Sequence, residues 1–367
     1  MDSEALVARA HVVALPLRER FRGIELREAL LIEGENAMWA EWSPFIEYDD
    51  AEAARWLGSA LEVLGAPFDS PPARSGSEGP ARSGNEGPAR SGSDIPPFPE
   101  RGPQGRVEGR AAAVRVNATV PAVSPDDVPA LLARFPGART AKVKVAERGQ
   151  RLADDLARVR AVRDVLGPSG RIRVDANAAW SLDEATIALE ALAALGLEYA
   201  EQPVAGVADL GALRRRLAGL VPIAADESIR KPADPIEVVR AGAADVVVLK
   251  AQPLGGPARA LKIARRARAE ADVAFVTSSA LETSVGLAAA ARFARAIDLA
   301  FSSDLDHGLG TAALLAADVT GEPLLPVDGR IPLRPVAPEP ELLERHAAPP
   351  ERAAFWTERL RRALRLA

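Results

Sequence analysis

The sequence contains no cysteine among its 367 residues, which excludes disulfides, thiolate metal sites and cysteine nucleophiles. No uncharged apolar run approaches the ~18–20 residues that a membrane span needs. The N-terminus is acidic and does not have the pattern of a secretory signal. The net charge is −5 and no basic block runs along the chain. We therefore expect a cytoplasmic protein that binds neither nucleic acid nor membrane.

Several catalytic motifs are also missing. There is no Gly-x-Ser-x-Gly elbow and no His-Glu-x-x-His, so a serine hydrolase or a zinc peptidase has no support. The chain has three histidines. His11 and His346 lie outside the region that we predict to be catalytic, whereas His307 could line its mouth.

Apolar residues make up 48% and charged residues 26% of the chain, which is typical of a globular protein with a large core. We predict an α+β capping domain at 1–70, with strands at 11–17 and 28–34, a basic loop at 18–23 and a helix at 49–64 that Asp49 or Asp50 can cap. Residues 321–367 form a Pro-rich tail that turns helical near Glu351 and packs back on this domain.

Residues 71–110 differ in kind from the rest of the chain. Residues 73–80, with the sequence Ala-Arg-Ser-Gly-Ser-Glu-Gly-Pro, recur almost unchanged at 81–88 and begin again at residue 89. An eight-residue repeat without large apolar side chains cannot bury enough surface to offset chain entropy. We interpret this segment as a flexible insert between two domains.

From 111 to 320, β-rich runs alternate with helical patterns, which indicates a (β/α)₈ barrel of the TIM type. A doubly wound open sheet is the alternative, but residues 117–121 do not form the Gly-rich loop that such a sheet usually carries after its first strand. The predicted strands are 113–120, 141–145, 171–176, 199–202, 222–226, 245–250, 273–278 and 300–304, and the predicted helices include 150–166, 181–195, 233–241, 257–270 and 281–296.

Five ionisable residues end consecutive predicted strands, roughly 24 to 31 residues apart, the length of one βα unit. They are Lys144, Asp175, Glu201, Asp226 and Lys250. The three acids could each cap a helix or pair with an arginine. Helix capping would not require the three acids to lie at the same depth on consecutive strands of the barrel. We therefore favour a site for a hard divalent cation, Mg²⁺ or Mn²⁺.

Lysines flank these acids at two positions in the predicted barrel. Lys142 and Lys144 are two residues apart in a strand, so both side chains point to one face. Burial and a neighbouring cation both lower a lysine pKa, which suits Lys144 to act as a general base. Lys250 enters the same mouth from the other side.

The motifs Lys142-Val-Lys144, Arg173-Val-Asp175-Ala-Asn177, Glu201-Gln-Pro203, Asp226-Glu227-Ser228 and Val248-Leu249-Lys250 together resemble the enolase superfamily. The resemblance implies a modified barrel with an N-terminal capping domain, Mg²⁺ held by the three acids, and proton abstraction by Lys144. The branch that the chain resembles most removes water from a hydroxylated cyclohexadiene carboxylate in menaquinone biosynthesis. Lys250 would stabilise the enediolate anion.

The resemblance also implies residues that support catalysis or bind substrate. Arg173 would support the metal site or Lys144, and residues 20–23 would form a mobile lid over the mouth. The remaining residues that we expect to contact or support the substrate are Lys142, Asn177, Ser278, Ser279, Gly308 and Arg22.

Three other interpretations stay open. The same five residues would serve a racemase or epimerase of N-acylated amino acids or dipeptides, with Lys144 and Lys250 as bases on opposite faces, or a cycloisomerase. A non-catalytic metal-binding scaffold is the third, although the intact set of five residues argues against it. We expect a small-molecule carboxylate as substrate and a monomer or homodimer.

Overall fold

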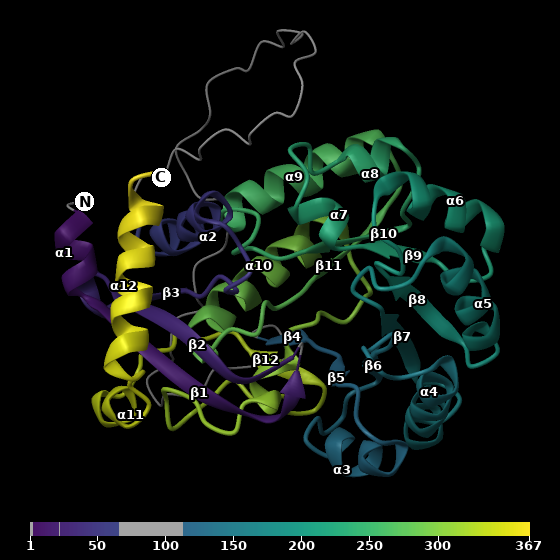
Figure 1. Ribbon diagram of the computed structural model, residues 1–367, viewed down its shortest axis with the longest axis horizontal. Helices are drawn as coiled ribbons and strands as arrows, with labels where there is room; N and C mark the ends of the chain where they lie inside the picture. Colours follow the sequence, from purple (N-terminus) through teal and green to yellow (C-terminus); the bar gives the residue numbers. More distant parts are fainter. Residues whose placement is uncertain (1–2, 22, 66–112) are drawn as a thin grey trace, which may run out of the picture.

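The computed structural model describes residues 3–21, 23–65 and 113–367 (Figure 1). The predicted insert at 71–110 and Arg22 lie outside the described residues. Within those ranges, no helix is long and apolar enough to cross a membrane.

The N-terminal unit is an antiparallel three-stranded sheet with one long helix against it. Its elements are α1 (Ser3–Ala8), β1 (Ala10–Phe21), β2 (Ile24–Glu33), η1 (Glu35–Ala37), β3 (Trp39–Trp42) and α2 (Asp50–Val63). The side chain of Asp49 accepts a hydrogen bond from the backbone N–H of Glu52 at 2.8 Å, so the predicted helix cap is confirmed. We call this unit the cap.

The predicted loop at 18–23 is wrong, because β1 continues through Phe21, which pairs with Ile24 of β2. Gly23 has a φ of +81°, a backbone conformation that suits the tight reversal between the two strands. The hairpin therefore carries Phe21 at its end, where a loop was expected.

The barrel consists of parallel strands whose spatial order follows the sequence, which confirms the predicted barrel against the open sheet. The sheet contains β5 (Ala118–Val120), β6 (Thr140–Lys144), β7 (Arg171–Asp175), β8 (Leu197–Glu201), β9 (Ile223–Ala225), β10 (Val246–Leu249) and β11 (Ala274–Thr277). The segments between them carry η3 (Pro125–Asp127), α3 (Val128–Leu132), α4 (Leu152–Leu166), α5 (Leu182–Ala193), α6 (Val207–Leu217), α7 (Glu227–Arg230), α8 (Glu237–Arg240) and α9 (Pro257–Glu270). Figure 1 shows helices outside the curled sheet.

The predicted strand at 300–304 is wrong, because α10 (Ser284–Phe301) continues to Phe301, whose ring lies 4.5 Å from that of Phe275. Two later residues close the barrel instead. His307 bridges to Val116, and Gly308 bridges to Ser278 at the end of β11, both in parallel sense. A two-residue bridge thus takes the place of the eighth strand.

The predicted first strand, 113–120, divides into two elements. Residues of β4 (Ala113–Arg115) pair antiparallel with β12 (Arg330–Pro332), and only β5 joins the barrel. The chain then runs through η4 (Gly310–Leu314), α11 (Pro340–Arg345) and α12 (Pro350–Leu364), so the helix predicted from about Glu351 is confirmed. The domain boundaries at 70, 110 and 320 stay predictions.

Helix α12 contacts the cap through aromatic and charged side chains. Trp356 lies edge-on to Trp42 with ring centroids 5.8 Å apart. The guanidinium of Arg359 donates to the backbone carbonyls of Phe45 and Tyr48 at 3.0 and 2.7 Å. The end of the chain therefore fixes the loop after β3, which carries Phe45 toward the barrel mouth.

Candidate active site

The strand register brings the predicted residues to one rim of the barrel. Lys144, Asp175 and Glu201 are direct neighbours across β6, β7 and β8. Asp226 follows β9 and Lys250 follows β10 without an intervening residue. All five residues are buried, with at most 9% of each residue's surface exposed. The parallel ladder thus places three carboxylates between two lysine positions.

Lysine ammonium groups bridge these carboxylates. Lys142 lies 2.9 Å from the Oδ2 atom of Asp175 and 2.6 Å from the Oε1 atom of Glu201. Lys144 lies 2.6 Å from the same Oδ2 atom, and Lys250 lies 2.6 Å from the Oδ2 atom of Asp226. Each ammonium donates and each carboxylate accepts, so the buried charges are paired.

The acids perturb one another. Burial raises the pKa of Glu201 to about 7, and the carboxylates of Asp175 and Asp226 add to the rise while Lys142 opposes it. Burial also acts to raise the pKa of Asp175, but Lys142 and Lys144 outweigh it and hold this pKa well below its usual range. In the same way, Lys250 and Arg230 outweigh burial and lower the pKa of Asp226.

The two lysines of β6 differ in their electrostatic environment. Burial lowers the pKa of Lys144, and the charge of Lys142 lowers it further against the attraction of Asp175. Burial acts in the same direction on Lys142, yet the carboxylates of Asp175 and Glu201 outweigh it and raise its pKa. Lys144 is therefore the lysine of β6 that more readily becomes a neutral amine.

Lys144 is also held at the rim by two groups that are not acids. It donates to the Oδ1 atom of Asn177 at 2.6 Å, and the ring of Phe21 lies 5.4 Å from its nitrogen. Asn177 adopts a φ of +47° while its backbone N–H bonds the Oδ1 atom of Asp175 at 3.0 Å. The side chain of Asn177 thereby positions Lys144, and its backbone N–H positions Asp175.

Within the described residues, no group of three or more His, Cys, Asp or Glu side chains is arranged to hold a metal ion. The donor set of Asp175, Glu201 and Asp226 nonetheless suits a hard cation, since it offers carboxylate oxygens alone. The three acids are fully buried on successive strands, and Asp175 and Asp226 both raise the pKa of Glu201. The three carboxylates therefore influence one another electrostatically in the same buried region.

Sequence analysis missed Arg230, which contacts Asp226, and Tyr48, which contacts Arg230. Arg230, four residues on, lies 3.1 Å from the Oδ1 atom of Asp226 and 2.6 Å from Glu227. It also donates to the hydroxyl of Tyr48 in the cap. The i, i+4 spacing of Asp226 and Arg230 was a readable signal, whereas the contact with Tyr48 was not, because it joins residues 182 positions apart.

Ser278, Ser279 and Gly308 lie at the same rim, on the side of β11 and the closing bridge. The hydroxyl of Ser279 accepts from the backbone N–H of Leu281 and from the hydroxyl of Thr311, each at 2.8 Å, and donates to Glu282. Gly308 packs so closely on Ser278 that an added Cβ would lie 2.7 Å from its Oγ atom.

A narrow cavity of about 40 Å³ lies between these residues and Lys144 and Lys250. Phe21 and Phe45 of the cap and Thr119 of β5 line it, none of which sequence analysis assigned as a substrate contact. The other lining residues are Lys142, Lys144, Asn177, Lys250, Ser278, Ser279, Ala280, Leu281, Gly308 and Thr311. This volume is smaller than the roughly 300–1,000 Å³ of typical small-molecule sites, and an adjoining cavity of about 270 Å³ shares Phe21, Lys144 and Asn177 with it.

The guanidinium group of Arg173 forms its hydrogen bonds away from the three carboxylates. Arg173 is fully buried and donates to Glu198 at 2.5 Å and to the carbonyl of Asp306 at 2.6 Å. No hydrogen bond or ion pair joins Arg173 to Asp175 or Lys144 among the described residues. Arg173 was expected to support the metal site or Lys144, but its long side chain turns toward the other end of the barrel.

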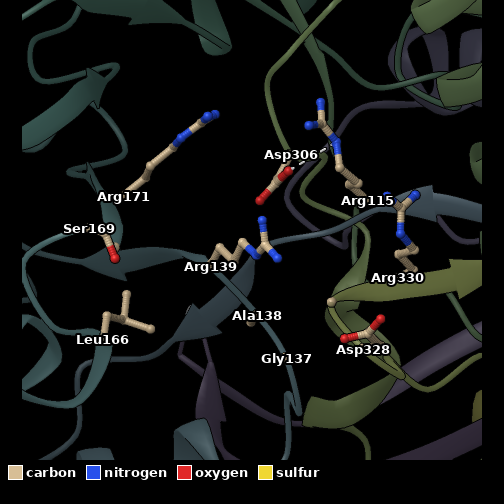
Figure 2. A pocket seen from close by; sticks show the side chains of 12 residues that line it. Arg115, Gly137, Ala138, Arg139, Leu166, Ser169, Arg171, Asp306, Asp328 and Arg330 are labelled. Atoms are coloured by element: carbon tan, nitrogen blue, oxygen red, sulfur yellow. Dashed lines mark ion pairs between the residues drawn. The ribbon is translucent and has the colours of Figure 1, made fainter.

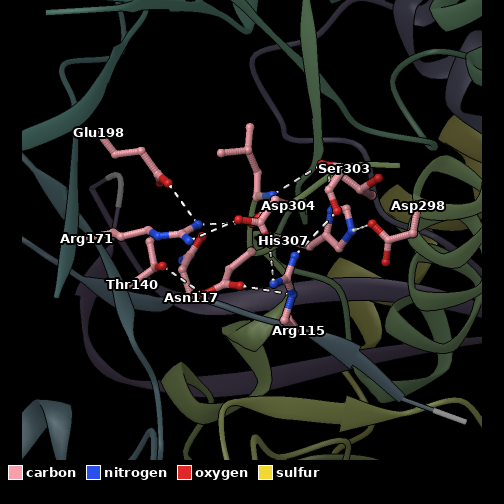
Figure 3. Close-up of polar contacts among 12 residues, drawn as sticks. Arg115, Asn117, Thr140, Arg171, Glu198, Asp298, Ser303, Asp304 and His307 are labelled. Atoms are coloured by element: carbon pink, nitrogen blue, oxygen red, sulfur yellow. Dashed lines mark hydrogen bonds and ion pairs between the residues drawn. The ribbon is translucent and has the colours of Figure 1, made fainter. Parts of the chain in front are cut away.

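His307 is a structural residue. Its Nδ1 atom accepts from the backbone N–H of Thr277 at 3.0 Å, so the proton sits on Nε2, which lies 3.0 Å from Asp298 (Figure 3). Because both ring nitrogens are engaged in a fully buried site, His307 fixes the closing bridge of the barrel and does not face the cavity.

Comparison with known proteins agrees with this geometry. Residues 12–63 match the enolase N-terminal domain-like model, and residues 130–338 match the enolase C-terminal domain-like model. Among solved structures, the muconate lactonizing enzyme from Pseudomonas fluorescens complexed with muconolactone has a TM-score of 0.66 at 22% identity, covering 93% of this chain and 98% of that one. The L-Ala-D/L-Glu epimerase from Bacillus subtilis has a TM-score of 0.65 at 22% identity, covering 90% and 96%.

Curated relatives are much closer in sequence. The o-succinylbenzoate synthase of Mycobacterium leprae is 47% identical over 97% of this chain and 91% of its own length. The o-succinylbenzoate synthase of Mycolicibacterium smegmatis is 48% identical over 97% and 95%. With two domain matches and near-full-length identity of this degree, the chain belongs to the o-succinylbenzoate synthase family of the enolase superfamily.

Proposed function

We propose that this protein is an o-succinylbenzoate synthase, a hydro-lyase of menaquinone biosynthesis that converts 2-succinyl-6-hydroxy-2,4-cyclohexadiene-1-carboxylate to 2-succinylbenzoate and water. The observation that carries the proposal is the row of three buried carboxylates between Lys144 and Lys250, in a chain 46–48% identical to synthases over nearly its full length. We assign it a small carboxylate as substrate and a monomeric or homodimeric state.

Lys144 is the general base in this proposal. Its neutral amine takes the proton α to the substrate carboxylate, which leaves an enediolate. The lowered pKa of Lys144 supports this role, because burial and Lys142 make the neutral form accessible. The proton then returns to the β-hydroxyl, which leaves as water while the ring becomes aromatic. One C–H bond and one C–O bond are broken, and no oxidant is needed.

Lys250 would stabilise the developing anion by its charge from the opposite side of the cavity. Asp175, Glu201 and Asp226 would hold Mg²⁺, or Mn²⁺ in its place. When bound, such a cation supplies Lewis-acid stabilisation of carboxylate oxygens. The hydroxyl of Ser278 and the backbone around Gly308, both on the cavity wall, are the donors that we assign to the succinyl carboxylate.

The decisive experiment supplies two substrates separately to the purified protein with Mg²⁺. We expect the cyclohexadiene carboxylate to be dehydrated, which is measured as loss of its diene absorbance and formation of the aromatic product. We expect an N-succinyl amino acid to exchange its α-proton at least about 100-fold more slowly. Faster conversion of the N-succinyl amino acid would contradict the synthase and indicate a racemase.

A further inference from the structure

A second cavity lies at the opposite end of the barrel from Lys144 and Lys250. Arg139 directly precedes β6 and Arg171 begins β7, whereas Lys144 ends β6. A five-residue strand separates the two ends of β6 by about 13 Å. The cavity has a volume of about 470 Å³, within the range of small-molecule sites. It is therefore separate from the catalytic site.

Four arginines line this cavity, and Figure 2 shows their side chains around it. They are Arg115, Arg139, Arg171 and Arg330, and the acids on the wall are Asp306 and Asp328. Asp304 and Glu198, next to the wall, also pair with Arg115 and Arg171. Among the described residues, the guanidinium groups of this wall without an acidic partner are those of Arg139 and Arg330, and such groups attract anions.

Two of the arginines are held in place by acids. Arg115 lies 2.8 Å from Asp304 and 3.4 Å from Asp306. Arg171 lies 3.1 Å from Asp304 and 3.4 Å from Glu198 (Figure 3). The carboxylate of Asp306 also accepts from Thr140 at 2.8 Å, so it is already engaged. These contacts fix the direction of both guanidinium groups.

The other two arginines have no acidic partner among the described residues. Neither Arg139 nor Arg330 forms an ion pair or a side-chain hydrogen bond in this part of the chain. Arg139 is exposed and Arg330 is half-buried, and both lie on the cavity wall in Figure 2. The guanidinium N–H groups of Arg139 and Arg330 are therefore available to a ligand.

The wall of the cavity is rigid where two glycines meet. A Cβ on Gly137 would lie 2.7 Å from the Cα of Asp328, and one on Gly329 would lie 2.6 Å from the carbonyl oxygen of Gly137. The backbone N–H of Gly329 donates to the carbonyl of Pro136 at 2.8 Å. This close backbone contact holds the turn before β12 against the loop before β6, so the cavity is preformed.

The lining also restricts the class of ligand. Among the described residues that line it, no aromatic side chain is present to stack on a nucleobase, and Leu166 is the largest apolar residue. Guanidinium groups match phosphate and carboxylate oxygens through paired hydrogen bonds. We propose that this cavity is a binding site for a small polyanion that carries two or more phosphate or carboxylate groups.

The proposal is tested by titration calorimetry on the full chain at about 50 mM salt, with pyrophosphate and with citrate as probes. We expect one of them to bind, and the tighter of the two identifies the anionic group. The variant Arg139→Gln/Arg330→Gln should lose at least about 10-fold in affinity for that probe, because the two arginines without acidic partners are removed.

The matched control is Arg160→Gln/Arg215→Gln, which removes the same charge from exposed positions on α4 and α6. It should retain wild-type affinity. Absence of binding by both probes, or an equal loss in both double variants, would overturn the proposal. Circular dichroism and dehydration of the cyclohexadiene substrate, both expected to be unchanged in the cavity variant, verify that it is folded. If the double variant does not fold, Arg139→Gln alone, at an exposed position, provides the same comparison.

Discussion

At the scale of single residues, the chemistry of the rim depends on which lysine can lose its proton. Lys142 and Lys144 share the carboxylate of Asp175, but only Lys142 also reaches Glu201. The second carboxylate keeps Lys142 charged, and that charge together with burial lowers the pKa of Lys144. Two lysines that are two residues apart thus differ, with Lys142 as a fixed cation and Lys144 as the proposed base.

We predict that Lys144→Ala lowers kcat/KM for dehydration by about 10²–10⁴-fold, the usual contribution of a general base. The measurement is the initial rate of aromatic product formation. Lys262→Ala, at an exposed position on α9, is the control and should keep its activity. Turnover of Lys144→Ala within a few-fold of wild type would remove Lys144 from the role of base.

We predict that Asp226→Asn abolishes Mg²⁺ binding measured by calorimetry, because the site loses one of three anionic donors. Asparagine keeps the shape of the side chain beside Arg230 and Lys250. Asp209→Asn, on the exposed surface of α6, should bind Mg²⁺ as wild type does. Undiminished binding by Asp226→Asn would show that Asp226 is not a ligand.

At the scale of elements, helices at the ends of the chain position loops that face the barrel mouth. Arg359 of α12 is almost fully buried and donates to backbone carbonyls of the 44–48 segment. That segment carries Phe45 to the wall of the active-site cavity and Tyr48 to Arg230. A helix distant in sequence from every catalytic motif therefore contributes to the shape of the site.

We predict that Arg359→Met lowers the free energy of unfolding by about 2–4 kcal/mol, because carbonyl groups lose their charged donor. Urea denaturation followed by circular dichroism measures the change. Arg362→Met on the same helix breaks only a partly exposed ion pair with Asp50 and should cost less than about 1 kcal/mol. Equal losses in the two variants would contradict the assigned role of Arg359.

At the scale of the whole molecule, the cap is joined to the barrel through two glutamates at helix N-termini. Glu41 accepts from the backbone N–H groups of Thr283 and Gly286 at the start of α10, at 3.0 and 3.2 Å. Glu62 accepts from Ala258 at the start of α9, at 3.0 Å. Each carboxylate satisfies N–H groups that a helix cannot satisfy itself.

The pKa of buried Glu41 provides a test of this interface. Burial raises it to about 7, with a further rise from Glu282. The folded protein thus holds this proton more tightly than the unfolded chain, whose glutamates titrate near ~4.3. As pH rises from about 4.5 through about 7, the free energy of unfolding falls, by on the order of 3 kcal/mol from this group.

We predict that Glu41→Gln removes this part of the pH dependence. Urea denaturation at about pH 5 and about pH 8 should show a smaller loss of stability on raising the pH in the variant than in wild type. Glu190→Gln, at an exposed position on α5, should keep the wild-type difference. The same pH difference in Glu41→Gln and wild type would contradict the raised pKa.

Much of the fold and the core of the site could be predicted from the sequence, because both rest on local patterns. Alternation of β-rich runs and helices predicted the barrel, and the ends of those runs placed Lys144, Asp175 and Glu201 in adjacent register. The eighth strand could not be predicted, since the bridge at His307 is too short to show a period.

By itself, the sequence determined which residues reach the rim, because strand spacing fixes both the depth and the facing of a side chain in a parallel barrel. Only the tertiary structure decided what those residues contact. Arg173 bonds to Glu198 and Asp306, and Arg230 reaches Tyr48, because long side chains find partners by distance in space. The arginines of the second cavity, scattered from Arg115 to Arg330, meet for the same reason.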